Sequence, residues 1–181
     1  MRVITGSARG RKLKELEGME TRPTTDRVKE GLFNAVQFDV EGRRVLDLFA
    51  GTGQLGIEAL SRGAASCVFV DLRADAAALT RENLALCGLE DRSKVYQTDY
   101  LAFLSTCREK FDLVFLDPPY AKGLLEKALE TAAKIDIISA NGIMVCESDV
   151  EQVLPDLPAP YEKGREYRYG KIKVTLYSRK A

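Results

Sequence analysis

The sequence Asp117-Pro118-Pro119-Tyr120 follows an apolar run, Phe111–Leu116, and its residue types suit chemistry on an amine. Two prolines rigidify a loop and remove two N–H donors, so that neighbouring carbonyl oxygens can face a ligand. The Asp117 carboxylate and the Pro118 carbonyl can then accept both hydrogens of an exocyclic base amine and favour the pyramidal geometry that its attack requires. Tyr120 can stack on the base, as aromatic side chains do when a base leaves a helix. A proline turn with a surface tyrosine is the alternative, and it leaves Asp117 without a role.

A second motif spans residues 47–56 and reads Asp47-Leu-Phe-Ala-Gly51-Thr-Gly53-Gln-Leu-Gly56. It lies between an apolar run and a helical pattern, where Gly51 and Gly53 permit a tight turn and a close approach of the backbone to a ligand. Gly56 permits close packing of the helix. Asp71 ends the next apolar run, where a carboxylate accepts hydrogen bonds from ribose hydroxyls. Together these residues predict a cofactor that contains a ribose.

The glycine motif alone leaves the choice of cofactor open. NAD and S-adenosylmethionine both carry adenosine, and both place an acidic residue on the ribose. A helix N-terminus suits a pyrophosphate, whereas a methionine zwitterion also needs a carboxylate near its ammonium or sulfonium. Asp47 precedes the glycines, where such an anion would be useful, although a residue at that place can also cap the backbone.

Composition excludes several other kinds of chemistry from this chain of 181 residues and 20.1 kDa. Histidine is absent, which removes Ser-His and Cys-His nucleophiles and histidine metal sites. The four cysteines are dispersed without a Cys-x-x-Cys pair, so we expect reduced thiols and no metal. No apolar stretch approaches the roughly 18 residues of a membrane span, and the N-terminus lacks the core of a signal peptide. A cytoplasmic protein away from membranes is expected.

The formal net charge is zero, but the charges are unevenly distributed. Residues 1–14 carry five basic and no acidic side chains, and residues 163–181 carry seven basic side chains and one acidic one. The segment 15–162 holds the remaining 15 basic and 26 acidic residues. Basic ends on an acidic body suit phosphate contacts to a nucleic acid, for which Arg9 and Arg11 are candidates. Solvated termini are the alternative interpretation.

The elements that position these motifs alternate from Arg44 onward between apolar runs and helical periods. The apolar runs are residues 45–49, 67–70, 95–97, 113–116 and 143–146. Helical periods occupy residues 55–62, 75–87, 101–107 and 124–134, after a first helix that Thr24 or Thr25 caps and that continues to about residue 36. Unalternated apolar strands separated by helices indicate βα units around a parallel sheet that is buried on both faces.

The two ends of the chain depart from this rhythm. Residues 1–16 predict a short hairpin around a glycine-containing turn at 6–10. Residues 161–169 and 171–179 are consecutive strand-like runs around Gly170, so an otherwise parallel sheet should finish with an antiparallel strand. We predict one domain over residues 1–181, with a basic hairpin extension at 1–20 and a catalytic core at 21–181.

Together the motifs resemble those of class I S-adenosylmethionine-dependent N-methyltransferases, in the stretches DLFAGTGQLGIEALSRGA, VDLRADA, QTDY and FLDPPY. The opening TGSARGRKL and the stretch RPTTDRVKEGLFNAV at residues 22–36 narrow the resemblance to the bacterial RsmD-type enzymes. Those enzymes methylate the N2 amine of a guanine in small-subunit (16S) ribosomal RNA. The resemblance spans the whole chain. It implies an α/β, Rossmann-like class I methyltransferase fold, with a seven-stranded, mostly parallel sheet and an antiparallel last strand.

The resemblance also implies roles for individual residues. Those that bind S-adenosylmethionine would lie around the glycine loop and after the next two strands: Asp47, Gly51 and Gly53 at the methionine part, Asp71 at the ribose and Asp99 at the adenine amine. The catalytic residues would be Asp117, Pro118 and Tyr120, while Pro119 and Tyr120 hold the guanine and Arg9 and Arg11 hold RNA. Arg22, Thr24, Phe33 and Asn34 would close the pocket. Position 71 is Asp where many relatives carry Glu, which shortens its reach.

The implied partner is ribosomal RNA within the small subunit or an assembly intermediate, bound by a cytoplasmic monomer without metal or membrane. Three alternatives stay open. An adenine-N6 methyltransferase acting on DNA or RNA could use the same Asp-Pro-Pro-Tyr chemistry. A nicotinamide oxidoreductase shares the glycine loop and would bind NADH, but it leaves that chemistry and the basic ends unexplained. A non-catalytic ribosome-assembly factor would need neither motif, and labelled methyl transfer would exclude it.

Overall fold

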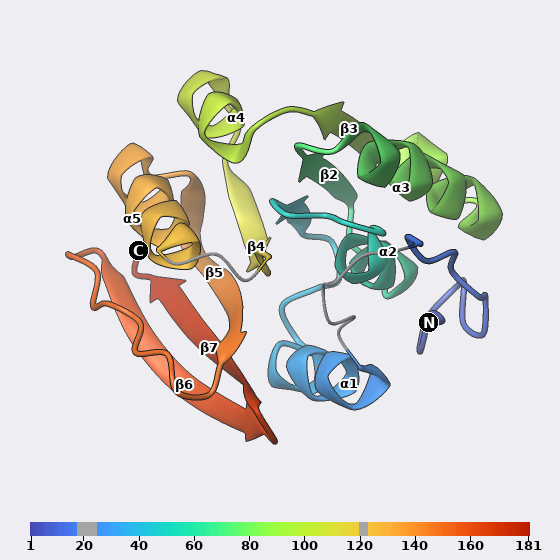
Figure 1. Cartoon of the computed structure of the whole chain (residues 1–181). Coiled ribbons are helices and arrows are strands. Elements are labelled where there is room, and N and C mark those ends of the chain that lie inside the picture. Colours follow the sequence, from blue (N-terminus) through green and yellow to red (C-terminus); the bar gives the residue numbers. More distant parts are fainter. Residues whose placement is uncertain (18–24, 120–122) are drawn as a thin grey trace.

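The computed structural model describes residues 1–17, 25–119 and 123–181, and a twisted sheet with helices on both faces runs through it (Figure 1). The seven strands of the described residues follow the order β3-β2-β1-β4-β5-β7-β6. In chain order they are Arg44–Asp47 (β1), Ser66–Asp71 (β2), Ser93–Gln97 (β3), Phe111–Leu116 (β4), Ile138–Asp149 (β5), Tyr161–Tyr169 (β6) and Ile172–Arg179 (β7). The helices are Asp26–Ala35 (α1), Gln54–Ser61 (α2), Ala74–Cys87 (α3), Tyr100–Thr106 (α4) and Leu124–Ile135 (α5), with a 3₁₀ turn at Glu90–Arg92.

Strands β1 to β5 are parallel, and β7 pairs antiparallel with both β5 and β6. The predicted sheet, with its antiparallel last strand, is therefore confirmed. Because parallel strands end at the same edge of a sheet, the loops after β1, β2, β3 and β4 gather at that edge. Ligands of open α/β sheets bind in this place, where the strand order reverses around β1 and β4.

Side chains of β2, and of β4 from Leu113 onward, alternate between the two faces of the sheet and build two apolar cores. Phe115 faces the core under α1 and α2, where its ring lies 5.5 Å from that of Phe33. Leu116, one residue further, faces the core under α4 and α5. Each fully buried Phe or Leu contributes about 1.5–3 kcal/mol, so the strand ends that carry the polar motifs are held in place from both sides.

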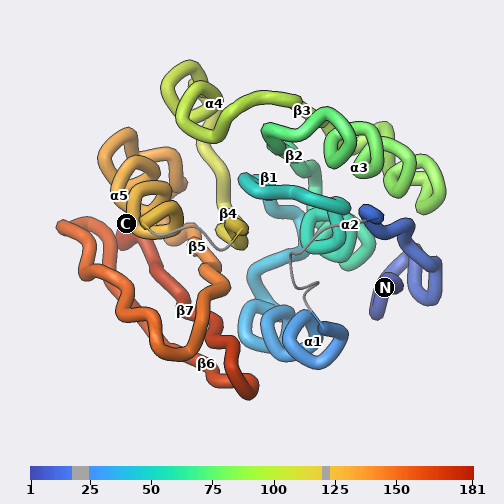
Figure 2. The backbone as a smooth tube through the Cα atoms, in the orientation of Figure 1, coloured from blue at the N-terminus to red at the C-terminus, as the bar shows by residue number. Residues whose placement is uncertain are grey.

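The N-terminal residues form the predicted short hairpin, with one antiparallel bridge between Arg2 and Lys12. This N-terminal arm, residues 1–17, stays outside the sheet and lies beside α2 and α3 (Figure 2). Gly6 lies against the end of α2, where a Cβ would come within 1.8 Å of the Ser61 carbonyl oxygen. Gly6 also has φ +93°, so two separate constraints require glycine there.

Strand β5 is longer than the apolar run 143–146 that predicted it. Its first residues include Asn141, with φ 66°, and the register with β4 shifts between Phe111 and Leu113. This polar, irregular beginning carries no apolar signal. Strand β1 stops at Asp47, two residues before the end of the predicted apolar run 45–49.

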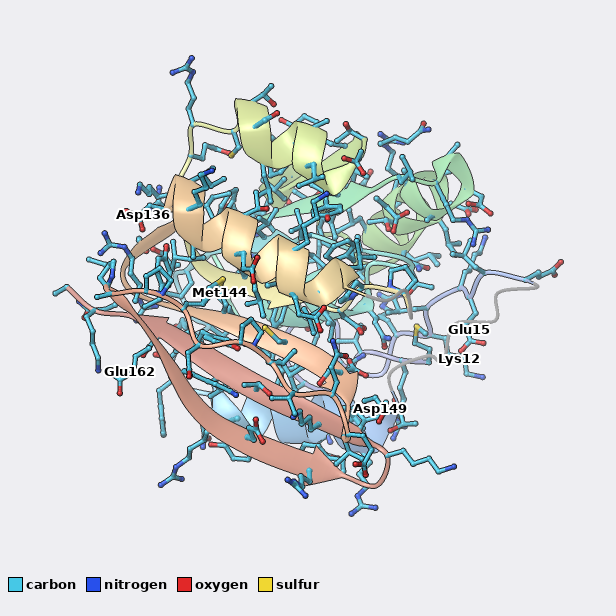
Figure 3. The ribbon with its side chains drawn as sticks, turned by 60° about the vertical axis from the view of Figure 1, so that its left-hand side comes forward. Lys12, Glu15, Asp136, Met144, Asp149 and Glu162 are labelled. Atoms are coloured by element: carbon cyan, nitrogen blue, oxygen red, sulfur yellow. The ribbon has the colours of Figure 1, made fainter. Side chains whose placement is uncertain are left out.

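Some basic residues of the C-terminal hairpin form ion pairs inside the fold. Lys173 is 4 % exposed and lies 3.4 Å from Glu166. Arg179 pairs at 2.8 Å with Asp136 at the end of α5, far from Lys12 and Glu15 of the N-terminal arm (Figure 3). Exposed basic side chains lie both on the arm, at Arg9, Arg11 and Lys12, and on the hairpin, at Arg165, Arg168 and Lys171. No helix within the described ranges is long and apolar enough to cross a membrane.

Candidate functional site

A cavity of ≈ 510 Å³ opens where the parallel strands end. This volume is typical of a pocket for a small molecule or cofactor. Its wall contains the glycine loop, the residues after β2, β3 and β4, and the end of β5. The acidic and amide residues that line it are Glu15, Asp47, Gln54, Asp71, Asp99, Asp117 and Glu147.

The glycine loop has the tight shape that its sequence predicts. Gly51 and Gly53 both lie in the left-handed region, with φ 58° and 84°, and the Gly53 N–H donates to the Ala50 carbonyl at 2.8 Å. A Cβ on Gly56 would come within 2.3 Å of the Phe69 ring. Gly56 therefore allows α2 to pack directly on β2, as predicted.

Asp71 connects the end of β2 to the glycine loop. Its Oδ2 accepts from the Gly51 N–H at 2.8 Å, and its Oδ1 accepts from the Arg73 N–H at 2.9 Å. A carboxylate has about four acceptor sites, so both oxygens can take further donors from the cavity. This arrangement suits a carboxylate that receives two neighbouring hydroxyl groups.

Asp47 is buried at the end of β1, with only 1 % of its surface exposed. Its Oδ2 accepts from the Gly56 N–H at 3.0 Å, and its Oδ1 has no hydrogen-bond partner within the described residues. Burial raises the pKa of Asp47 to about 7, and the nearby Asp71 charge adds to that rise. An unsatisfied buried carboxylate oxygen is costly, so a cationic or N–H-bearing ligand in the cavity would supply a partner that the described residues do not.

Gln54, in the first turn of α2, also has a buried oxygen that a hydrogen-bond donor on a ligand could satisfy. Its side chain is 8 % exposed, and its Oε1 has no partner in the described part of the chain. Buried polar atoms without partners are rare in native proteins and call for an explanation. Sequence reasoning missed Gln54 because it occupies a variable position of the glycine motif.

Asp99 begins α4, and its Oδ2 accepts from Leu101 N–H at 3.0 Å and from Ala102 N–H at 3.3 Å. The neighbouring wall is apolar. The Phe49 and Tyr100 rings lie 5.1 Å apart, and Leu72 is 65 % exposed although it borders the cavity. The exposed Leu72 and the tilted ring pair offer an apolar surface for a planar ring, and sequence reasoning named neither Leu72 nor Phe49.

At the other end of the cavity, Asp117, Pro118 and Pro119 follow β4 and line the wall. Tyr120 lies outside the described residues, as do Arg22 and Thr24. Glu147 lines the same part of the cavity from β5 and is 8 % exposed. Sequence reasoning missed Glu147 because the apolar run that marked this strand ends at residue 146.

The N-terminal arm completes the wall with Met1, Glu15 and Leu16. The Met1 ammonium lies 3.4 Å from Glu15 Oε1, so the two strands of the arm are joined at the cavity. Arg9 and Arg11 are exposed on the turn of the arm and are not part of this wall. The arm thus contacts the cavity at one end and presents positive charge at the other.

Two other expectations concern residues around the pocket. The expectation that Phe33 closes the pocket is wrong, because Phe33 is fully buried between α1 and the sheet, with the Arg62 guanidinium 4.6 Å above its ring. Its neighbour Asn34 is exposed. Within residues 1–17, 25–119 and 123–181, no three His, Cys, Asp or Glu side chains are grouped to hold a metal ion.

A sheet of this strand order, with a glycine loop after β1 and an acidic residue at the end of β2, has the fold of class I S-adenosylmethionine-dependent methyltransferases. Residues 1–178 match the family described as conserved hypothetical protein 95. The chain belongs to this family, which is the RsmD family.

Relatives with assigned names extend over the whole chain. A candidate rRNA methyltransferase of Bacillus subtilis, YlbH, is 40 % identical over 99 % of this chain and 100 % of its own. Ribosomal RNA small subunit methyltransferase D of Escherichia coli is 35 % identical over 100 % of this chain and 91 % of its own.

Solved structures agree with the fold. The Escherichia coli protein yhhF, titled a candidate methyltransferase, superimposes with a TM-score of 0.90 at 34 % identity, covering 100 % of this chain and 98 % of its own. An RNA methyltransferase of Salinibacter ruber, solved with S-adenosyl-L-homocysteine, has a TM-score of 0.66 at 18 % identity, over 88 % of this chain and 94 % of its own. That second likeness concerns the fold alone.

Proposed function

We propose that this protein transfers a methyl group from S-adenosylmethionine to the exocyclic N2 amine of a guanine in small-subunit ribosomal RNA. One observation carries the proposal: the glycine loop, with its unsatisfied buried acceptors, and the Asp117-Pro118-Pro119 loop open into the same cavity. A cofactor at the first and an amine at the second would meet within that cavity. The names of the full-length relatives support ribosomal RNA as the substrate.

The cavity fits S-adenosylmethionine residue by residue. Asp47 Oδ1 and Gln54 Oε1 are buried acceptors without partners in the described chain, as the ammonium of a methionine group requires. Asp71 would hold the ribose. Asp99 commits one oxygen to the start of α4 and would use the other for the adenine amine. When bound, the cofactor supplies a methyl group on a positively charged sulfur, which is a good leaving group.

The residues after β4 would prepare the amine. The lone pair of a guanine N2 is delocalised into the ring, so the nitrogen is a poor nucleophile while it stays planar. The Asp117 carboxylate and the Pro118 carbonyl would accept its two hydrogens and favour a pyramidal nitrogen, whose lone pair points at the methyl carbon. Holding the two reactants in line is the main catalytic contribution. Neither residue needs to form a covalent bond to the base.

The N-terminal arm would bring the RNA to this cavity. Arg9 and Arg11 are exposed on its turn, and contacts from such side chains to phosphates supply affinity that does not depend on sequence. Because Met1, Glu15 and Leu16 wall the cavity, we propose that the arm and the core over residues 1–181 act as one methyltransferase domain. In this proposal the protein works as a cytoplasmic monomer on the small subunit or an assembly intermediate.

The test replaces Asp117 and measures single-turnover methyl transfer to small subunits from cells that lack this protein. If the carboxylate acts mainly in the transition state, Asp117→Ala lowers the rate by about 10²–10³-fold, the scale for removing one preorganised polar group. Asp117→Asn falls between, because its carbonyl accepts one hydrogen bond without a charge. The affinity for S-adenosylhomocysteine, measured by calorimetry, should stay the same.

The matched control is Asp91→Ala, which removes an exposed carboxylate from the 3₁₀ turn and should keep the parental rate. An Asp117→Ala protein that methylates at close to the parental rate contradicts the mechanism. If it loses only the affinity for S-adenosylhomocysteine, the loop after β4 belongs to the cofactor pocket and the base is held elsewhere.

A further inference from the structure

Glu147 has no role in the mechanism above, yet it lies in β5 directly beside the residue that would hold the amine. Strands β4 and β5 are parallel, and their register pairs Leu116 with Cys146. Asp117 is therefore the residue directly after β4, and Glu147 is the next residue of the adjacent strand β5. Leu116 and Cys146 both face the core under α5, so Glu147 follows on the opposite face of the sheet. Asp117 and Glu147 both line the cavity.

The position of Glu147 is more fixed than that of Asp117. Asp117 begins a loop, but Glu147 is still inside β5, where it is paired with Val174 of β7. The Glu147 side chain is 8 % exposed, although it belongs to the wall of an open cavity. A carboxylate held by strands on both sides and turned into the cavity is well placed to recognise a ligand by geometry.

An independent feature indicates that an N–H-bearing ligand completes this cavity. Gln54 Oε1 and Asp47 Oδ1 are both buried and without partners among the described residues. Asp47 and Gln54 are 1 % and 8 % exposed, and both belong to the same wall as Glu147. The wall as a whole is rich in acceptors, which suits donors on the bound molecules.

The hydrogen-bonding edge of guanine fits two neighbouring carboxylates. That edge carries two adjacent donors, the N1–H and the N2 amine, whereas adenine has an acceptor at N1 and an amine at N6. Flipped or single-stranded bases are read by hydrogen bonds to this edge. Adjacent strands lie about 4.8 Å apart, so carboxylates at the ends of β4 and β5 can reach two adjacent N–H groups. A carboxylate facing the N1 of adenine would instead meet another acceptor.

We propose that Glu147 determines the specificity for guanine, by accepting the N1–H of the base whose N2 amine Asp117 and Pro118 hold. This inference rests on the proposed function and adds what selects the base. Asp117 and Pro118 can grip any exocyclic amine, so they do not distinguish guanine from adenine. Glu147 does, because it is satisfied by a donor at N1 and repelled by an acceptor there.

The experiment uses small subunits reconstituted with RNA that carries either guanosine or 2-aminopurine riboside at the methylated position. The analogue keeps the N2 amine but has an acceptor at N1. In the parental protein, single-turnover methylation of the analogue should be slower by about 10²-fold, since a hydrogen bond to a charged group is lost. Glu147→Gln should methylate guanosine more slowly. Its amide can donate to the N1 of the analogue, so the ratio of the two rates should fall to within about tenfold.

Two further variants make the test independent of any general damage. Glu147→Ala neither accepts nor repels at N1, so the two bases should react at similar rates. Glu162→Gln alters an exposed glutamate paired with Lys180, and it should keep the parental ratio. The affinity of every variant for S-adenosylhomocysteine should remain within about twofold of the parental value, which also verifies that the variant is folded.

Three outcomes would overturn the assignment. If Glu147→Gln and Glu147→Ala slow both bases by the same factor, Glu147 does not read N1. If they lose affinity for S-adenosylhomocysteine while the ratio stays at its parental value, Glu147 belongs to the cofactor pocket. If the parental protein leaves guanosine unmethylated, the proposed function itself fails, and the specificity of Glu147 fails with it.

Discussion

Two buried carboxylates on the same strand–loop–helix unit have opposite surroundings. Glu58, in the middle of α2, is fully buried and receives four donors: Ile4 N–H at 2.8 Å, Thr5 N–H at 3.0 Å, Arg62 Nε at 2.9 Å and Lys29 Nζ at 3.3 Å. Asp47, at the start of the same unit, is equally buried and receives a single donor from the described residues, the Gly56 N–H.

From this difference we infer a structural role for Glu58 and a ligand-binding role for Asp47. The donors of Glu58 come from the N-terminal arm, α1 and α2, so this carboxylate fastens the arm to the core. Burial lowers the pKa of Lys29, and the neighbouring Glu58 opposes that shift. Asp47 lines the cavity and keeps one oxygen without a partner among the described residues, which a bound ligand would supply. Changes at Glu58 should therefore affect folding, and changes at Asp47 should affect binding.

Glu58→Ala should give the largest effect and should appear in stability. Removing this carboxylate leaves the buried Lys29 charge without its counter-ion, with only the Arg2 carbonyl as acceptor, and leaves two N–H groups of the arm without acceptors, which costs about 3–5 kcal/mol. Denaturant unfolding measures the loss. The control is Glu162→Ala, whose exposed ion pair with Lys180 should contribute about 0–1 kcal/mol. Equal losses of unfolding free energy in the two variants would contradict the structural role of Glu58.

Asp71→Ala should weaken binding of S-adenosylhomocysteine by about 1.5–3 kcal/mol, the usual scale for hydrogen bonds to a charged group. Because Asp71 also accepts from Gly51 N–H, the variant could act through the glycine loop. An analogue without the ribose hydroxyls distinguishes the two cases in calorimetry. If Asp71 contacts the ribose, the variant and the parent bind this analogue with nearly equal affinity. A full loss with the analogue would show that Asp71 acts only on the loop.

The pH dependence of cofactor binding should show whether Asp47 pairs with the ammonium of the ligand. Its pKa is about 7 in the ligand-free protein, so the carboxyl is protonated below that value and cannot pair with an ammonium. Affinity for S-adenosylhomocysteine should fall as the pH decreases from 7 to 5, by up to about tenfold per unit. Asp47→Asn does not titrate and corrects for the ionisation of the ligand. Parallel pH profiles for the two proteins would contradict the assignment.

The raised pKa of Asp47 makes the stability of the fold depend on pH in the opposite direction from cofactor affinity. Asp47 has a higher pKa in the folded chain than its ordinary value of 3.8, so the folded state holds the proton more tightly. The free energy of unfolding should therefore fall as the pH rises between about 4 and 7. Asp47→Asn should remove that part of the decrease in a denaturation series. No change in slope would mean that Asp47 is ionised in the folded protein throughout this range.

The arm should have the smallest effect on chemistry and a clear effect on RNA affinity. Changing Arg9 and Arg11 to Glu should lower the slope of log affinity against log salt by about 1.4–1.8, since each of the two phosphate contacts contributes about 0.7–0.9. Cofactor affinity should not change. Arg108→Glu with Lys134→Glu makes the same change in net charge after α4 and at the end of α5, away from the cavity. If the arm variant and the control variant show the same salt dependence, the arm does not contact phosphates and is a solvated terminus.

The fold was largely predictable because apolar runs mark buried strands directly. The order of runs and helical periods is sufficient for a parallel sheet, and the paired runs around Gly170 for its antiparallel end. Phe33 misled the prediction because a residue on the buried face of α1 was assigned to the pocket by resemblance, while packing against Phe115 placed it in the core.

Part of the site was beyond sequence reasoning for a physical reason. Gln54 and Glu147 belong to it through burial and strand register, and neither property is visible in a local pattern. In the sequence, Glu147 follows an apolar run, a position that is typical of the polar end of a strand. Only its pairing with β7 and its position beside Asp117 indicate that it enters the cavity. Met1, Glu15 and Leu16 reach the cavity because Glu58 fastens the arm, an interaction across more than 50 residues.

The product nucleoside gives the clearest evidence about the proposed reaction. Small subunits from cells lacking this protein are incubated with the purified protein and S-adenosylmethionine labelled in its methyl group. The ribosomal RNA is then digested to nucleosides and analysed by mass spectrometry. We expect one labelled nucleoside, N2-methylguanosine, at a single position of the small-subunit RNA. Labelled N6-methyladenosine, or the absence of any labelled nucleoside, would contradict the proposed function.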